Sequence, residues 1–253
     1  MNDSRYIDFI SAYCDRWCER CALTERCSLF AVHAAMAMCD GDDEEAMELA
    51  VGGAPSEEGE RDEPDLSAWV RESNARTSPT PAAMEAFDRE RAERDARLDA
   101  TSIMQTARAY TVLAARWLRA QSAALKEQAL RRRPGPALPR ESLDPAQLLQ
   151  SLEVVEWDCL LIPVKLRRAL HGLDEIARGD LDDDFVRADA NGTAKLSLLC
   201  IDRSEAAWRV IAEWSDNEFA AIFAEQLAQL RSEIEESFPS AREFIRPGLD
   251  ELG

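Results

Sequence analysis

The feature that most constrains the fold is a long run, from Ala82 to Arg133, that contains neither glycine nor proline. Most apolar residues in it recur at intervals of three or four, which is the period of an α-helix. The run predicts either one helix of about 50 residues, roughly 75 Å at 1.5 Å per residue, or two helices broken at a polar position. Such a length is typical of the spine of a helical bundle.

The N-terminal fifth of the chain predicts two shorter helices. The first begins at Asp3 or Ser4, a plausible N-cap, and extends through Trp17. Its apolar stripe consists of Tyr6, Phe9, Ile10, Tyr13 and Trp17. The second helix is capped by Thr24 and reaches about Ala50.

The C-terminal part predicts two more long helices. One runs from about Leu148 to Arg178 and is kinked or restarted at Pro163, which has no N–H to donate. The stretch "GDLDDDFVRADANGT" is expected to be a loop, with Thr193 capping the last helix. A capping-box sequence at Ser215 can restart that helix, which then reaches Ser237.

These elements predict an all-α protein, a bundle of long, mostly antiparallel helices with an N-terminal helix–turn–helix that carries a four-cysteine site. Residues 1–51 are expected to form the cysteine-rich helical hairpin. Residues 52–80 are expected to be an acidic linker with a short helix from about Leu66 to Glu72. Residues 81–253 are expected to form the long-helix bundle, packed with the hairpin.

Charge and hydropathy restrict the function classes. The formal net charge is −19, which repels nucleic-acid backbones and anionic lipid surfaces, so neither nucleic acid nor membrane is expected as a partner. The first ten residues have neither the basic start nor the apolar run of a secretory signal. No apolar stretch approaches the length of a membrane helix. We therefore expect a cytoplasmic protein.

Four cysteines gather near the N-terminus, in "AYCDRWCERCALTERCSLF". A reducing compartment and an odd total of seven cysteines argue against a disulfide framework and favour metal ligands. Cys14, Cys18 and Cys21 are four and three residues apart, so they share one face if the first helix persists. Cys27 follows the second helix's cap. The sequence therefore predicts a metal site made by these four thiols at the corner between two helices.

The kind of metal depends on the local backbone. Zinc requires four thiolates within about 4 Å of one another. Two turns of continuous helix separate Cys14 from Cys21 by roughly 10 Å, which suits an iron–sulfur cluster better. Unwinding near Cys18 would favour zinc instead. The first expectation is a cluster with a sensing, electron-transfer or assembly role, and the alternative is zinc. Plain packing of the thiols and a C-x-x-C redox pair are further alternatives.

The cysteine spacing has two partial resemblances. Cys14-x3-Cys18-x2-Cys21 is similar to the cluster signature of radical S-adenosylmethionine enzymes. Cys18-x2-Cys21-x5-Cys27 resembles part of the auxiliary-cluster pattern of SPASM domains, which continue with a cysteine where this chain has Ala31. No alternating strand–helix pattern accompanies either motif. The resemblances imply that clusters accept such intervals and do not place the chain in either family.

Two other functions remain open. In the first, zinc stabilises an interaction module whose charged helix, Asp88 to Asp99, docks a protein partner. In the second, an enzyme uses a polar pocket lined by Glu153, Glu156, Lys165 and Asp202, charges that would otherwise form an ion-pair network between helices. No catalytic motif is found. Cys159 and Cys200 lie in apolar runs and are expected to be core thiols.

Overall fold

The computed structural model describes residues 5–39, 45–46, 49–50, 80–131, 144–179, 183–215 and 219–251. Within these ranges all the regular elements are helical, and no strand occurs. Three 3₁₀ turns come first, η1 (Ile10–Ala12), η2 (Cys18–Arg20) and η3 (Thr24–Arg26). The α-helices are α1 (Ser28–Met38), α4 (Pro81–Asp99), α5 (Ser102–Arg131), α6 (Pro145–Arg178), α7 (Asp183–Trp214) and α8 (Phe219–Ser237). The all-α prediction is confirmed.

The chain divides into two compact units. One comprises residues 1–11 and 16–97, and the other comprises residues 12–15 and 98–253. Most of the predicted acidic linker, residues 52–79 with its short helix, lies outside the described residues. The predicted break between α5 and α6, residues 132–143, lies outside them as well.

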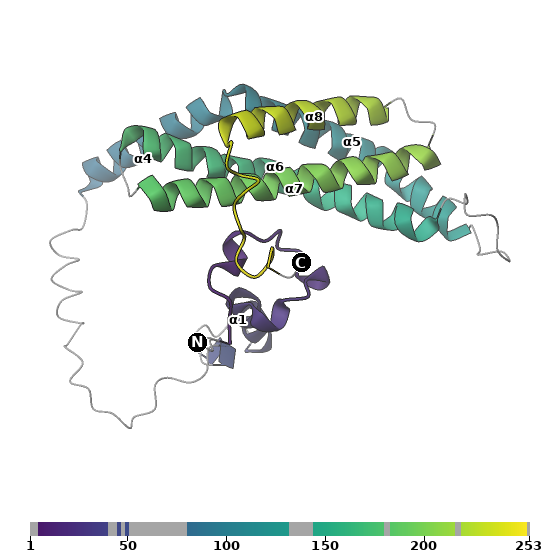
Figure 1. Ribbon diagram of the computed structural model, residues 1–253, viewed down its shortest axis with the longest axis horizontal. Coiled ribbons are helices and arrows are strands. Elements are labelled where there is room, and N and C mark those ends of the chain that lie inside the picture. The colour runs from purple at the N-terminus through teal and green to yellow at the C-terminus, as the bar shows by residue number, and fades with distance from the viewer. Residues whose placement is uncertain are drawn as a thin grey trace. The chain divides into compact units, whose positions relative to one another are not determined.

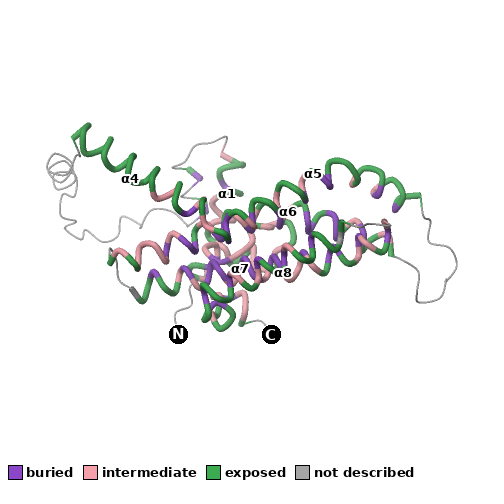
Figure 2. The backbone as a smooth tube through the Cα atoms, turned by 90° about the horizontal axis from the view of Figure 1, so that it is seen from above, coloured by how far each residue is buried: buried purple, intermediate pink, exposed green. Residues whose placement is uncertain are grey.

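The larger unit is an antiparallel four-helix bundle. Helix α5 packs on α6, α6 on α7, α7 on α8 and α8 back on α5, and Figure 1 shows the four helices side by side. The contacts fix the register of each pair. Thr111 of α5 lies opposite Cys159 of α6, and Asp99, just before α5, lies opposite Arg167 of α6, so the two helices run in opposite directions. Figure 2 shows the buried residues of this bundle on its inner faces, as expected for amphipathic helices.

The glycine-free and proline-free run forms two helices rather than one. Helix α4 ends at Asp99, and α5 begins at Ser102. The polar break is Thr101, whose hydroxyl donates to the Leu98 carbonyl oxygen at 2.6 Å. Its own carbonyl accepts the N–H of Gln105, so Thr101 closes one helix and opens the next. The second of the two sequence-based alternatives is therefore the observed one.

Helix α6 ends at Arg178, as the sequence predicts, and begins at Pro145, three residues before the expected Leu148. The Asp144 side chain caps it by accepting the Ala146 N–H at 2.9 Å, and Pro145 occupies the first turn, where its missing N–H costs nothing. At the other end Gly179 adopts a left-handed conformation, φ 72°, which glycine tolerates without strain.

Pro163 lies inside α6 and leaves the Cys159 carbonyl oxygen without its intrahelical donor. A neighbouring helix supplies the missing bond. The Thr111 hydroxyl of α5 lies 2.6 Å from that oxygen and donates to it. This side chain compensates the proline from outside the helix, so α6 continues through Pro163 as one helix.

Helix α7 corrects the predicted loop. From Asp183 onward the stretch is helical, and Thr193 is no cap, because its hydroxyl donates to the Asp189 carbonyl within the same helix. Gly192 lies in this helix despite its low propensity. A Cβ there would approach the rings of Tyr13 and Phe244 to 2.6 Å, so the two rings pack directly on the bare glycine. Tertiary packing overrides the local turn signal.

The predicted first helix is wrong. The regular elements between residues 10 and 26 are the three short 3₁₀ turns η1, η2 and η3. Phe9 and Arg16 have positive φ angles of 60° and 58°, which interrupt any α-helix. The second helix begins at Ser28, four residues after the expected cap, because Thr24–Arg26 is the turn η3. The smaller unit also contains an alanine cluster made by Ala35, Ala46 and Ala50.

Candidate functional site

Three of the four predicted ligands lie in the smaller unit. Cys18 opens the turn η2 and Cys21 follows it, and the N–H of Cys21 donates to the Cys18 carbonyl at 3.1 Å. Cys27 follows η3 and precedes α1. All three side chains are half-buried. The Cys21 Sγ accepts the backbone N–H of Leu23 at 3.4 Å.

Cys14 belongs to the larger unit, and the residues beside it are fixed there. The Asp15 carboxylate accepts a hydrogen bond from Arg203 at 2.7 Å, and its carbonyl oxygen accepts the indole N–H of Trp157 at 2.9 Å. On the other side, the Tyr13 ring packs against Phe244, with 4.9 Å between ring centroids. Burial, together with the Asp189 carboxylate, raises the pKa of Tyr13 to about 12. Both neighbours of Cys14 are therefore anchored to the bundle.

No metal-binding group is found in the described residues: no three or more histidine, cysteine, aspartate or glutamate side chains converge there on one point. None of the seven cysteines forms a disulfide. The four-cysteine site thus stays a prediction from sequence. No helix in the described ranges is long and apolar enough to cross a membrane.

Cys159 and Cys200 are buried in the bundle, as the sequence predicts. Burial raises the pKa of the Cys159 thiol to about 12, with a further contribution from the carboxylate of Asp158. Burial also raises the pKa of the Cys200 thiol well above its usual value. Both thiols therefore stay protonated near neutral pH, in the form that neither attacks an electrophile nor binds a metal ion readily.

The polar centre of the bundle is an ion pair between Asp158 of α6 and Arg203 of α7. Asp158 is fully buried, and its two oxygens accept from the Arg203 Nε at 2.9 Å and Nη2 at 2.5 Å. Burial raises the pKa of Asp158, and the guanidinium offsets part of that rise. Because Arg203 also binds Asp15, one side chain joins α6, α7 and the segment 12–15.

Two of the charges singled out in the sequence, Asp202 and Glu156, form ion pairs with residues outside the predicted pocket. Asp202 binds Arg231 of α8 at 3.0 Å and Arg242 of the C-terminal segment at 2.6 Å. Glu156 lies 4.0 Å from Lys126. Asp202 is therefore part of an ion-pair network.

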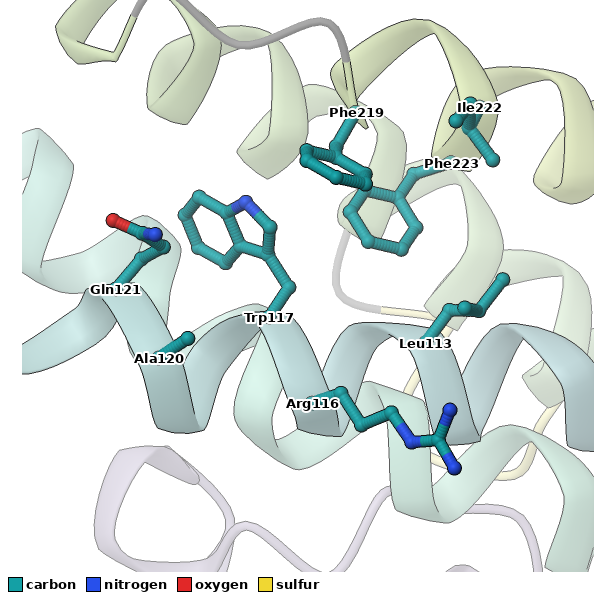
Figure 3. A pocket seen from close by; sticks show the side chains of 8 residues that line it. All are labelled: Leu113, Arg116, Trp117, Ala120, Gln121, Phe219, Ile222 and Phe223. Carbon is teal, nitrogen blue, oxygen red and sulfur yellow. The ribbon is translucent and has the colours of Figure 1, made fainter.

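The structure instead contains an apolar cavity of about 350 Å³ between α5 and α8, shown in Figure 3. Its lining consists of Leu113, Arg116, Trp117, Ala120, Gln121, Phe219, Ile222 and Phe223. The sequence analysis missed this cavity. The lining residues follow helical spacing within each helix. The sequence of either helix alone does not indicate that a space remains between the two when they pack together.

The floor of the cavity, formed by Trp117 and Phe223, is part of a larger aromatic cluster. The Phe223 ring stacks on Trp208 with 4.0 Å between centroids, and Trp117 meets Trp208 edge to face at 5.0 Å. The Trp208 indole N–H donates to the Tyr110 hydroxyl at 3.1 Å, and both of these side chains are buried. Stacking and this hydrogen bond hold the floor in one arrangement.

No family, curated protein or solved structure matches this chain.

Proposed function

We propose that the cysteines near the N-terminus bind one metal centre, and that the protein uses this centre to stabilise an interaction module. The observation that carries the proposal is the set of four half-buried cysteines within fourteen residues, none of them in a disulfide. Cys14, Cys18, Cys21 and Cys27 are the proposed ligands. Metal binding is coupled to the arrangement of its ligands, so thiols can converge when the ion binds.

The local backbone favours zinc over an iron–sulfur cluster. A cluster was the better expectation only while Cys14 to Cys21 formed a continuous helix, which sets the thiols far apart. The observed 3₁₀ turn instead places Cys18 and Cys21 at its two ends. Short turns of this kind present two thiolates to one small ion.

Helix α4 is the surface proposed for a protein partner. Its first three turns are exposed, as Figure 2 shows, and they include two large apolar side chains, Met84 at 51% and Phe87 at 62% exposure. Exposed apolar residues on a charged helix are typical of helices that bind another protein. This observation favours an interaction role over an enzymatic one.

Metal analysis of protein purified without oxygen tests the proposal. We expect colourless protein with one zinc per chain, and loss of zinc in a Cys18→Ser, Cys21→Ser double variant. A matched Cys39→Ser variant should keep its zinc. Brown protein with stoichiometric iron and sulfide would show that the metal centre is an iron–sulfur cluster and not zinc. Absence of both metals, with all four thiols open to alkylation, would refute the metal centre.

Cys14 has a separate test because it lies in the other compact unit. If it is the fourth ligand, Cys14→Ser should weaken zinc affinity while leaving the bundle's unfolding midpoint unchanged. An unchanged affinity would restrict the ligand set to the three cysteines of the smaller unit together with another donor.

A further inference from the structure

We propose that the cavity between α5 and α8 binds a small apolar organic anion, of the class of medium-chain fatty acids. This inference is independent of the metal centre. It depends on the size of the cavity, the chemistry of its walls and a single cation at its edge.

The size and walls fit a small molecule. Cavities that hold small ligands measure about 300–1,000 Å³ and are lined mainly by apolar and aromatic side chains. This one measures about 350 Å³, and six of its eight lining residues are apolar. Trp117 and Phe223 form the buried part, at 7% and 1% exposure. An aliphatic chain or a small ring system matches such walls.

The cavity is formed before a ligand arrives. Its floor is held by the stacked pair of Trp208 and Phe223 and by the bond from Trp208 to Tyr110. Its rim, by contrast, exposes Phe219 at 54% and Ile222 at 44%. Covering an apolar rim of this kind is favourable because it removes apolar surface from water. A fixed floor lowers the entropic cost of binding.

The charge at the edge selects an anion. Arg116 is exposed at the edge of the cavity, and Figure 3 shows its guanidinium extending away from the rings and out of the cavity. Among the described residues no carboxylate forms an ion pair with it, in a chain of net charge −19. The other polar lining residue, Gln121, is neutral. Because the guanidinium extends outward, a ligand whose apolar body lies in the cavity would meet the one cation of the lining only with an anionic head that lies outside, at the edge of the cavity.

Two probes test the proposal on the full-length protein. One is the fluorescent apolar sulfonate 1-anilinonaphthalene-8-sulfonate, and the other is decanoate, measured by calorimetry and by displacement of the first. We expect saturable binding of one probe molecule per chain. Decanoate should displace the sulfonate, and decylamine should do so more weakly, because its charge meets Arg116 as a like charge.

Variants assign the binding to this cavity. Ala120→Trp places an indole in the cavity from an exposed position and should abolish binding, whereas Ala206→Trp on an exposed part of α7 should not. Arg116→Gln should weaken decanoate binding about two- to fivefold, the effect of one exposed ion pair. Arg119→Gln, a neighbouring exposed arginine outside the lining, is the matched control.

Three results would overturn the proposal. The first is no saturable binding of either probe. The second is binding that Ala120→Trp leaves intact, which would place the probes elsewhere. The third is self-association in sedimentation that Ala120→Trp abolishes, because a second copy of the chain would then cover this surface.

Discussion

The bond from Thr111 to the Cys159 carbonyl gives the sharpest stability prediction. In Thr111→Val the hydroxyl is lost with little change in shape, and Pro163 has no N–H to replace it. A buried carbonyl left without a donor costs about 1–3 kcal/mol. Since Thr111 is half-buried, we expect the free energy of unfolding to fall by about 1–2 kcal/mol. For a unit of this size that lowers Tm by about 2–8 °C.

The assay is urea unfolding of the bundle, followed by circular dichroism, with a double-mutant cycle. In Pro163→Ala the new N–H can donate to the Cys159 oxygen, so Thr111→Val should cost about 1 kcal/mol less in that background. Thr106→Val is the matched control, because within the part of the chain that the structure describes its hydroxyl makes one long contact, 3.5 Å from Gln229, and the change should alter stability by less than about 0.5 kcal/mol. Equal costs of Thr111→Val in both backgrounds would refute the compensation.

Three further predictions concern packing, acid stability and thiol reactivity. Gly192→Ala should lower the free energy of unfolding by about 1–2 kcal/mol, despite the better helix propensity of alanine, because the added methyl would overlap two aromatic rings; an unchanged Tm would contradict the packing. Burial alone would raise the pKa of Asp250, but hydrogen bonds from Arg246 and Lys195 outweigh it and hold the pKa well below its usual value. The stability from these bonds is therefore present above about pH 4 and lost as the pH falls through the lowered pKa, so Asp250→Asn should reduce the drop in Tm between pH 7 and pH 3; an unchanged drop would contradict this. Maleimide should label Cys159 and Cys200 at pH 7 only after unfolding, and rapid labelling of either thiol in the native protein would contradict its burial.

The C-terminal ends of α6 and α8 could be predicted from the sequence because their signals are local. Helix α6 ends at Arg178 before Gly179, and α8 stops at Ser237 before a proline. Each signal acts within one helical turn, through a fixed φ angle or a missing N–H. Such effects do not depend on what the helix later packs against.

The candidate site was harder to predict. The sequence identifies Cys14, Cys18, Cys21 and Cys27 as one cluster, but it places the first three on an α-helix because Tyr6, Ile10 and Tyr13 have helical spacing. In the structure Ile10 and Tyr13 are buried without that helix. A periodic apolar pattern records which residues are buried, and it does not record which surface buries them.

The sequence by itself determined that the chain is helical, where most helices of the bundle end, and that a cluster of thiols lies near the N-terminus. Only the tertiary structure decided that Gly192 is helical, that Arg203 joins Asp158 to Asp15, and that an apolar cavity remains between α5 and α8. The reason is physical. Backbone propensity, capping and period act within a few residues, whereas these three features depend on segments that meet from distant parts of the chain, up to 188 residues apart for Asp15 and Arg203.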